Sequence, residues 1–259
     1  MDGTMPPPNE EQNNVSAPVT SQTAAKDYSA LYMPGAIILA GAMIAVGLFF
    51  GLSHGGAQTG QPAPKKVDVK DVKTANEPFI GKADAPLTMA YWSDYQCPFC
   101  KAVEVGGVPQ IPVEPSIPLL IKDYVDTGKL KIVFKDFVFL GQDSITAAEY
   151  EHAVWEMAPD KFYAWRDAMF KAQDSEGDQG FGDEPSILAL IRKIPGLDAN
   201  KLKALVAQKK AEYDADMQAN TAEGQSFGIQ GTPGFIIGKK SIDGAVSPEQ
   251  FKDAIESQL

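Results

Sequence analysis

Two cysteines separated by two residues are the residues of this chain best suited to chemistry. Cys97 and Cys100 are the only cysteines among 259 residues, and they follow the apolar run Leu87–Trp92. Such a pair after a predicted buried strand is typical of a redox site. A zinc site would need about four ligands, and the two histidines have no ligand spacing to the cysteines. A structural disulfide stays open, although a bridge that closes so short a loop constrains the unfolded chain little.

The residues around the pair predict that Cys97 is the attacking thiol. A helix beginning at Cys97 would place its sulfur near unbonded backbone N–H groups and near the positive end of the helix dipole. Both favour the thiolate, which is the attacking species in disulfide exchange. Pro98 suits a first helical turn, because it lacks the N–H that would be unbonded there. We expect Pro98 and Phe99 to tune the thiolate pKa; Phe99 is neutral and donates no side-chain hydrogen bond, so the helix terminus would supply most of the stabilisation.

The motif SDYQCPFCK, preceded by GKADAP at 81–86, resembles the DsbA-like group of thiol:disulfide oxidoreductases. Matching segments follow in the same order: KIVFKDF at 131–137, AAE at 147–149 and GTPGF at 231–235. The resemblance covers about Pro78 to Leu259. It implies an α/β protein with a thioredoxin fold and a helical domain inserted after the second core strand, and no organic cofactor.

The resemblance also implies roles for individual residues. Cys97 would be exposed and form the mixed disulfide with substrate, and Cys100, one helical turn further in, would resolve it. Pro233 would be cis and face the pair. The Thr232 backbone would then lie open beside Cys97, able to pair with an extended substrate strand, so Thr232 and Pro233 are the expected substrate-binding residues.

Two features depart from the family pattern. Many relatives carry a buried acid on the strand before the motif, whereas this chain has Tyr91 at the equivalent place. Lys101 and Glu104 are near enough in sequence to substitute, but we expect them to form a solvated salt bridge. A Gly/Pro-rich stretch over 106–115 also interrupts the helix that usually continues after the cysteines. We expect a surface insertion there, with a rim of the substrate groove as the alternative.

The elements that must position these residues are predicted from apolar spacing and from helix-ending residues. Apolar residues at helical spacing, as in Pro185–Ile194, indicate helices that pack one face on the core. The helical insertion is expected at about 141–224 within a domain spanning 77–259. The predicted helices are Ser144–Ala158, Lys161–Ala172, Pro185–Ile194, one beginning after Asp198, and a final helix opened by a capping box at 247–250; the predicted strands are Lys131–Val138, Phe235–Gly238 and a hairpin return at Ser241–Val246.

The acidic loop 174–184 partly matches a calcium-binding loop. Asp174, Glu176 and Asp178 lie at ligand spacing, but Gln179 stands where glycine is needed and Pro185 where a bidentate glutamate is needed. We therefore expect a solvated acidic loop and no metal site.

The N-terminal quarter of the chain differs in composition from the rest. Residues 1–33 lack an apolar pattern and are predicted to be disordered. Residues 34–52 contain no charge and are long enough to span a bilayer as one helix. A cleaved signal peptide would require a short basic segment before this run, and the 33 preceding residues contain Lys26 alone as a base. We expect an uncleaved membrane anchor at 34–52 and a flexible linker at 53–76.

Two features of the sequence disagree about which side of the membrane holds the catalytic domain. Three lysines, at positions 26, 65 and 66, lean weakly toward a cytoplasmic domain. A cysteine pair of this type works where disulfides form and persist. We expect a single-pass protein of the cytoplasmic membrane whose catalytic domain is extracytoplasmic.

The sequence thus predicts a membrane-anchored dithiol oxidase that introduces disulfides into exported proteins. Its partners would be unfolded or partly folded exported proteins and a membrane protein that resets the disulfide. A reductase or isomerase using the same pair, or a thioredoxin-fold binding domain, remains an alternative, because the sequence does not give the potential of the pair. The net charge of −11 argues against nucleic acid as a partner.

Overall fold

A computed structural model describes residues 66–174 and 180–259 of the chain. The predicted tail at 1–33, the predicted anchor at 34–52 and most of the predicted linker lie outside the described residues. Within 66–174 and 180–259, no helix is long and apolar enough to cross a membrane.

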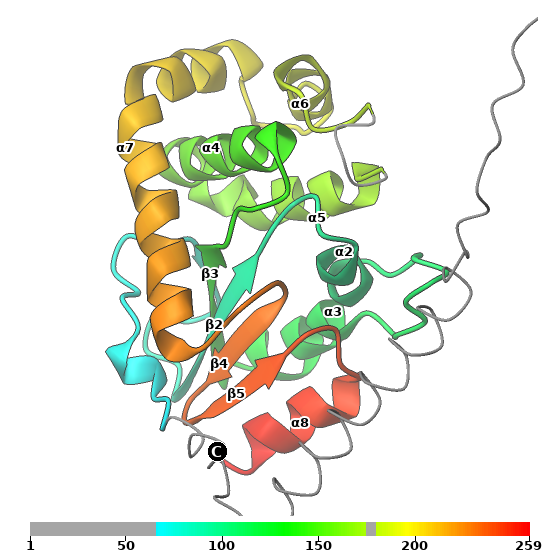
Figure 1. Cartoon of the computed structure of the whole chain (residues 1–259), viewed down its shortest axis with the longest axis vertical. Helices are drawn as coiled ribbons and strands as arrows, with labels where there is room; N and C mark the ends of the chain where they lie inside the picture. Colours follow the sequence, from blue (N-terminus) through cyan, green and yellow to red (C-terminus); the bar gives the residue numbers. More distant parts are fainter. Residues whose placement is uncertain (1–65, 175–179) are drawn as a thin grey trace, which may run out of the picture. The chain divides into compact units, whose positions relative to one another are not determined.

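A five-stranded sheet forms the centre of the fold, in the order β1-β3-β2-β4-β5 (Figure 1). The central strands β2 and β3 are parallel and in register from Leu87 opposite Leu130 to Ser93 opposite Asp136. All other neighbouring strands are antiparallel. The strands are β1 (Phe79–Ile80), β2 (Leu87–Ser93), β3 (Leu130–Asp136), β4 (Gly234–Ile237) and β5 (Lys240–Asp243). The predicted strands are confirmed, with their ends shifted by a few residues.

One face of the sheet packs against helices α2, α3 and α8. Because side chains alternate along a strand, Met89 and Tyr91 of β2 point to this face, where they join a buried cluster with Phe235 of β4 and Phe251 of α8. The helices are α2 (Pro98–Glu104), α3 (Ser116–Leu120), which continues as a π-helical turn over Ile121–Val125, and α8 (Pro248–Glu256). Helix α8 begins after Ser247 as predicted, but the Ser247 side chain makes no capping hydrogen bond.

The opposite face of the sheet is covered by the segment that precedes β1. Val67, Val69 and Val72 are buried in a cluster with Ala90 and Trp92 of β2. A 3-10 turn over Val69–Asp71 holds the segment in place, since the Val69 N–H donates to the Gly238 carbonyl at 2.7 Å. The predicted linker at 53–76 is therefore wrong at 67–72, because the valines there cover apolar strand surface.

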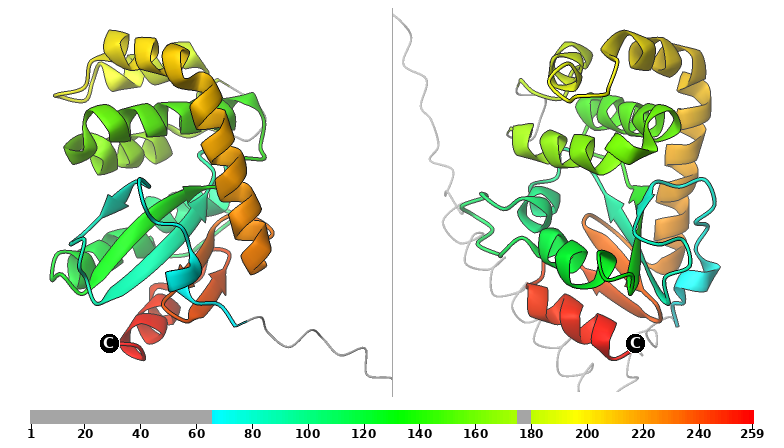
Figure 2. Two further views of the ribbon diagram at one scale, coloured as in Figure 1. Left: turned by 90° about the vertical axis from the view of Figure 1, so that its left-hand side faces the viewer. Right: turned by 180° about the vertical axis from the view of Figure 1, so that it is seen from behind.

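The predicted helical insertion forms a layer at one end of the sheet (Figure 2). Its four helices confirm the prediction: α4 (Gln142–Met157), α5 (Phe162–Ala172), α6 (Glu184–Ile191) and α7 (Ala199–Phe227). Helix α7 is 29 residues long, so it begins in the helical layer and ends on the sheet (Figure 1). There the Trp92 indole N–H donates to the Asn220 carbonyl at 3.0 Å.

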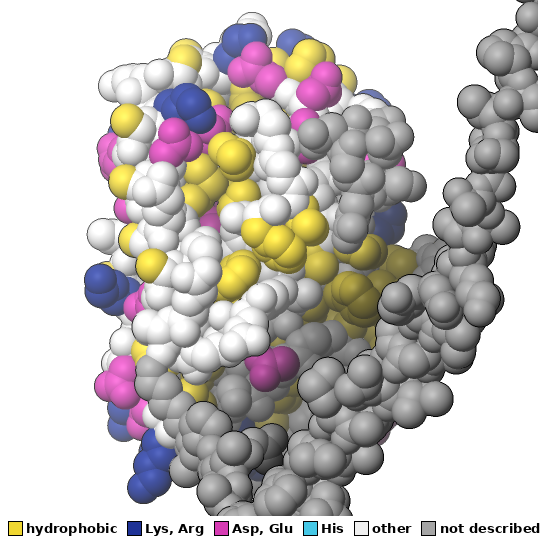
Figure 3. Space-filling model, viewed as in Figure 1, with side chains coloured by type: hydrophobic (Ala, Val, Ile, Leu, Met, Phe, Trp, Pro, Cys, Tyr) yellow, Lys and Arg dark blue, Asp and Glu magenta, His cyan; other side chains and the backbone are white. Residues whose placement is uncertain are grey.

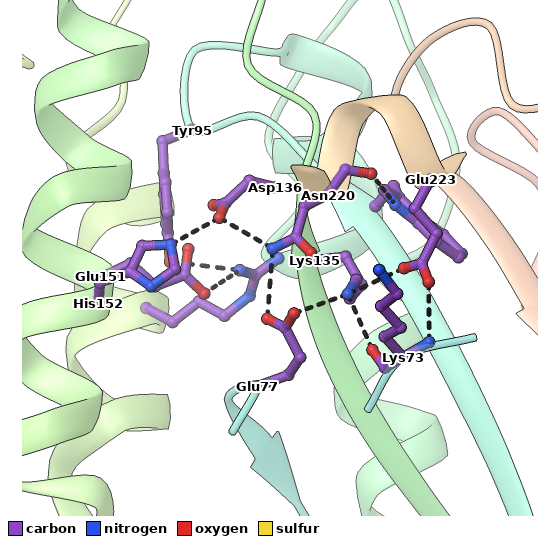
Figure 4. A network of polar contacts seen from close by, with 11 residues as sticks. Lys73, Glu77, Tyr95, Lys135, Asp136, Glu151, His152, Asn220 and Glu223 are labelled. Atoms are coloured by element: carbon purple, nitrogen blue, oxygen red, sulfur yellow. Dashed lines mark hydrogen bonds and ion pairs between the residues drawn. The ribbon is translucent and has the colours of Figure 1, made fainter. Parts of the chain in front are cut away.

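Charged residues at the end of β3 join four parts of the chain (Figure 4). Lys135 is buried, and its Nζ lies 2.7 Å from Glu77 and 3.0 Å from Glu223 of α7. Asp136 binds the His152 ring of α4 at 2.8 Å and accepts from Asn220 of α7. Because buried charges are costly unless paired, these contacts fix the segment before β1, the sheet, α4 and α7 relative to one another.

Candidate active site

The cysteine pair lies where β2 ends and α2 begins. Cys97 is the N-cap of α2 with extended backbone angles, and Pro98 occupies the first helical position, as predicted. The buried carboxylate of Asp94 holds the turn between them. It accepts hydrogen bonds from the Gln96 N–H at 2.9 Å, the Ser144 hydroxyl at 2.6 Å and the Phe139 N–H at 3.0 Å. The turn is therefore tied to the start of the helical insertion.

Both sulfur atoms are shielded from solvent. The exposed fraction is 3% for Cys97 and 0% for Cys100, and both thiols are free. The predicted exposure of Cys97 is therefore wrong for this conformation. The reason is that its thiol packs against Thr232 and donates to the Thr232 carbonyl oxygen at 3.3 Å.

The two thiols have opposite electrostatic environments. The Cys100 thiol, by donating a hydrogen bond to Cys97, lowers the pKa of Cys97 against the opposing effect of burial, and Thr232 and the backbone N–H groups of Phe99 and Cys100 lower it further. Burial raises the pKa of Cys100 well above its usual value, and the neighbouring Cys97 raises it again. The arrangement can thus hold a thiolate at Cys97 and a neutral thiol at Cys100.

The Thr232–Pro233 peptide bond is cis, which confirms the expectation from the resemblance. It precedes β4 and brings the Thr232 carbonyl to the Cys97 sulfur. A groove of about 300 Å³ runs beside this bond. Its lining residues are Gly228, Gln230, Gly231, Thr232, Pro233, Asp243 and Gly244.

The helical insertion holds the backbone of the cysteine turn through Gln173. The Gln173 side-chain amide donates to the carbonyl oxygens of Tyr95 at 2.6 Å and of Cys97 at 3.1 Å. Lys101 donates from α2 to the Gln173 carbonyl at 2.6 Å. Gln173 directly follows α5. The sequence offered no signal for its role, because a glutamine at a helix end is ordinarily solvated.

The predicted solvated salt bridge between Lys101 and Glu104 is wrong. Glu104 is 1% exposed and pairs with the buried Arg166 of α5, whose Nε lies 2.8 Å from Glu104 Oε1. Burial raises the pKa of Glu104, although Arg166 opposes this effect. The physical reason is that the last turn of α2 faces the core and the insertion, where Arg166 supplies the counter-ion.

Arg166 joins the insertion to the end of β2. Its guanidinium also donates to the Ser93 hydroxyl at 2.8 Å and to the Tyr95 hydroxyl at 3.2 Å. It lies over four aromatic rings, those of Tyr91, Tyr95, Phe134 and Phe170, at 4.3 to 5.3 Å from their centroids. A buried arginine needs such partners. Sequence reasoning missed it, because its partners lie far away in the chain.

The break after α2 is confirmed. The helix ends at Glu104, and Gly106 and Gly107 adopt positive φ angles of 70° and 75° before α3 begins at Ser116.

The described part of the acidic loop uses its carboxylates within the protein. Asp174 accepts from the Phe181 N–H at 2.8 Å, Asp183 caps α6, and Glu184 pairs with Lys203 at 2.6 Å. Within 66–174 and 180–259, no group of three potential ligands could hold a metal ion. Residues 175–179, which include two of the predicted ligand positions, lie outside the described residues.

The sheet order, the helical insertion and a Cys-Pro-Phe-Cys turn facing a cis proline define a DsbA-like thioredoxin-superfamily oxidoreductase. The sequence profile of a family described as "Thioredoxin" matches residues 73–257, and the chain belongs to that family.

Similar proteins point the same way. "Disulfide bond formation protein D" of Bacillus subtilis is 27% identical over 206 residues, which are 78% of this chain and 82% of that protein. The crystal structure of oxidised BdbD from Bacillus subtilis matches with a TM-score of 0.62 and 25% identity, over 74% of this chain and 95% of that one. The thiol-disulfide exchange protein alpha-DsbA2 from Wolbachia pipientis, at 22% identity and a TM-score of 0.60, covers 71% of this chain and 88% of its own and shares the fold. The chain is a thiol:disulfide oxidoreductase.

Proposed function

We propose that this protein is a dithiol oxidase that introduces disulfides into exported proteins. Cys97 exchanges with the substrate, Cys100 resolves the mixed disulfide, and the redox-active disulfide is the only redox group used. The observation that carries this proposal is the opposite perturbation of the two thiols, with the pKa of Cys97 lowered and that of Cys100 raised. A pair whose reduced form is stabilised through a thiolate is a better oxidant of other dithiols.

The surface around the pair suits an unfolded protein as substrate. In the view of Figure 3, most charged side chains lie over the helical insertion and at the outer edges, and the surface between them carries mainly apolar and uncharged groups. Phe99, inside the cysteine motif, is 48% exposed. Exposed apolar surface next to a reactive pair is expected where partly folded chains bind. An extended substrate would pair with the Thr232 backbone beside Pro233.

The proposed location of the catalytic domain follows from its disulfide chemistry. An oxidase of this kind works outside the reducing cytoplasm, so the catalytic domain is placed on the extracytoplasmic side, with residues 34–52 as a single-pass anchor in the cytoplasmic membrane. A membrane protein would reset the disulfide after each turnover. The names of the Bacillus relatives, which refer to disulfide bond formation, support this direction of transfer.

The deciding experiment measures the reduction potential of the pair and its activity on a reduced, unfolded protein. We expect a potential well above roughly −270 mV, the value of a reducing thioredoxin, and a disulfide-containing product. A potential at or below that value, with net reduction of disulfides, would overturn the oxidase and favour the reductase.

Trapping variants test the roles of the cysteines. Cys100→Ser should accumulate mixed disulfides with substrate through Cys97, because no thiol remains to resolve them. Cys97→Ser should accumulate few. Trapping through Cys100 alone would contradict the assignment.

A further inference from the structure

A groove of about 430 Å³ runs between helix α7 and the start of α4. The cysteine chemistry makes no use of it. Its apolar lining consists of Val138 in the loop after β3, Ile145 of α4, and Met217 and Ala222 of α7. Figure 3 shows apolar side chains on this face, beside α7 and again near the middle of the view. Apolar side chains that stay accessible in a groove mark a binding surface.

The polar lining of this groove suits a polypeptide backbone. Gln142, Gln218 and Gln225 line it with exposed side chains. A carboxamide both donates and accepts hydrogen bonds, so these side chains can pair with peptide N–H and C=O groups of any sequence. The charged lining residues Lys210 and Asp214 form an ion pair with 3.3 Å between Nζ and Oδ1. The groove thus offers apolar contact together with uncharged hydrogen-bonding groups.

One wall of the groove is fixed to the cysteine turn. The Asp94 carboxylate accepts hydrogen bonds from the Phe139 N–H at 3.0 Å and from the Ser144 hydroxyl at 2.6 Å. The Asp94 carbonyl accepts from the Cys97 N–H at 3.1 Å. Phe139 directly follows the lining residue Val138 and is 53% exposed. It therefore adds apolar surface between the groove and the cysteine turn.

The other wall of the groove leads to the cis proline. Gln225 of α7 lines the groove, and Gly228, about one helical turn later, lines the groove beside Pro233. The Gly228 N–H donates to the Gln225 carbonyl at 3.0 Å. Thr232, whose backbone is the expected partner of a substrate strand, lines that second groove as well. The two grooves therefore meet at the end of α7.

We propose that the groove along α7 binds the part of an unfolded substrate chain that flanks its reacting cysteine. The chain that pairs with the Thr232 backbone continues past Phe139 and lies along α7 as an extended segment. This proposal rests on the oxidase function proposed above, and it extends the contact with substrate beyond the residues next to the reacting cysteine.

The length of the groove fits several extended residues. Its lining on α7 runs from Lys210 to Gln225. A helix rises about 1.5 Å per residue, so this stretch is roughly 22 Å long. An extended chain advances about 3.3 Å per residue, which places about seven substrate residues beside α7, with alternate side chains facing the apolar lining.

Charge distinguishes this groove from the other flank of α7. There Glu212, Asp216 and Glu223 line a separate cleft of about 600 Å³. Segments of a partly folded protein that will later form its core are rich in apolar residues. They gain from apolar contact, whereas carboxylates must stay hydrated or paired. The groove between α7 and α4 is therefore the flank that fits such a segment.

Reduced peptides with one cysteine pair test the groove. A short peptide is compared with two longer ones that carry about eight further residues, three of them leucine, on the N-terminal or the C-terminal side. Oxidised full-length protein is mixed with each peptide, and the second-order rate constant of peptide oxidation is measured. One longer peptide should react roughly tenfold or more faster than the short one, as expected for burial of about one leucine side chain. Serine in place of the leucines should remove this advantage.

Thr221→Trp should fill the groove, because Thr221 is a half-buried lining residue. The ratio of the rate constants for the longer and the short peptide should then fall to within about twofold. Ala215→Trp is the matched control, since Ala215 is exposed on the same helix and is not among the lining residues of either groove, and it should keep the wild-type ratio. A variant that is only partly folded lowers both rate constants and leaves their ratio unchanged.

Equal rate constants for all peptides in the wild type, or a wild-type ratio in Thr221→Trp, would overturn the proposal and leave the oxidase standing. Failure of the wild type to oxidise any peptide would instead overturn the proposed function.

Photo-crosslinking identifies the surface that the substrate occupies. A longer peptide with one cysteine and a benzophenone in its extension is joined to Cys97 of the Cys100→Ser variant and irradiated. Crosslinks should map to residues 138–145 or 210–225, and crosslinks confined to residues 98–115 would overturn the proposal. With benzoylphenylalanine in place of Thr221 and no substrate present, crosslinks to residues 1–65 or to a second copy of the chain would also overturn it, because the groove would then have another occupant.

Discussion

At the scale of single residues, two chemically identical thiols are made different by their neighbours. Cys97 caps a helix and receives hydrogen bonds from the Cys100 thiol and from backbone N–H groups. Cys100 lies one turn further in, fully buried among apolar side chains. The difference between the two thiol pKa values follows from the position of each cysteine along α2 and from its burial. The spacing of the two cysteines in the sequence does not reveal how large this difference is.

This difference predicts selective labelling of the reduced protein. At about pH 6, iodoacetamide should modify Cys97 at least roughly tenfold faster than Cys100, because each pKa unit above the pH costs a factor of ten in thiolate. The gap should narrow as the pH rises and both thiols ionise. Mass spectrometry of quenched time points measures both rates, with Cys97→Ser as the control for Cys100. Equal rates from about pH 5 to 8 would contradict the asymmetry.

The sequence predicted the reacting residues and missed those that hold them. Cys97, Cys100, Thr232 and Pro233 could be predicted because they belong to short motifs that carry the family resemblance, which implies that the Thr232–Pro233 bond faces the pair across 135 residues of sequence. The supporting contacts of Arg166, Gln173 and Asp94 join positions 45 to 78 residues apart. Such contacts depend on how the insertion packs on the sheet, which spacing within one segment does not encode.

At the scale of elements, helix α7 connects the insertion to the sheet through a close approach at Gly224. A Cβ atom at this position would lie 2.9 Å from the Trp92 Nε1 atom. Trp92 is fully buried and bonded to the Asn220 carbonyl, so it has little room to move. The absence of a side chain at Gly224 therefore sets the distance between α7 and β2.

Gly224→Ala should destabilise the protein by about 1–3 kcal/mol, as overpacking of a core does, even though alanine is the better helix former. Gly231→Ala is the control, because its Cβ would meet nothing within 4 Å and its φ angle is not positive. Urea unfolding of the two variants measures the difference in free energy. A stabilised Gly224→Ala would mean that α7 moves away from the sheet at little cost.

The junction of β3 with α4 predicts a pH dependence of stability. Burial alone would lower the pKa of His152, but the Asp136 carboxylate raises it to about 9. A folded-state pKa above the unfolded one means that the stabilisation is complete below the unfolded value of about 6.5 and is lost as the pH rises through 9. The shift of about 2.5 units corresponds to roughly 3 kcal/mol at most.

Chemical unfolding of the wild type and of His152→Gln between about pH 6 and 10 checks this dependence. The wild type should lose stability over this range relative to the variant. In an Asp136→Asn background, adding His152→Gln should no longer change how stability depends on pH. The reason is that Asp136→Asn removes the charge that raises the pKa of His152. Parallel curves for the wild type and His152→Gln would contradict a charged His152 in the folded protein.

Helix and strand predictions succeeded where apolar spacing is regular and failed at the edges. The four helices of the insertion appear as expected, since each buries an apolar face, and the central strands β2 and β3 appear as expected because both of their faces are buried. The segment at 67–72 was predicted wrongly as linker, because three valines among charged residues look like a linker until the strands that they cover are known.

At the scale of the whole molecule, the described residues 66–174 and 180–259 form one compact unit. The segment at 67–72 belongs to it, since it closes the face of the sheet that α7 leaves open. The boundary of the folded domain therefore lies before Val67, upstream of the start of the matched family profile at residue 73.

Two truncations test this boundary. A chain of residues 66–259 should have the same free energy of unfolding as this domain has in the full-length protein. A chain of residues 77–259 should lose about 2–5 kcal/mol or more, because it uncovers Ala90, Trp92 and Ile236 and removes three buried valines. Thermal and urea unfolding measure both. Equal stability of the two truncated chains would mean that residues 66–76 do not stabilise the domain and that the predicted linker at 53–76 is right.

The early end of α2 has a consequence for how relatives of this protein can diverge. The N–H groups that act on Cys97 belong to the first turn of a seven-residue helix, before the loop at 106–115 begins. Insertions, deletions and substitutions over 106–115 can therefore accumulate while these N–H groups continue to lower the pKa of Cys97.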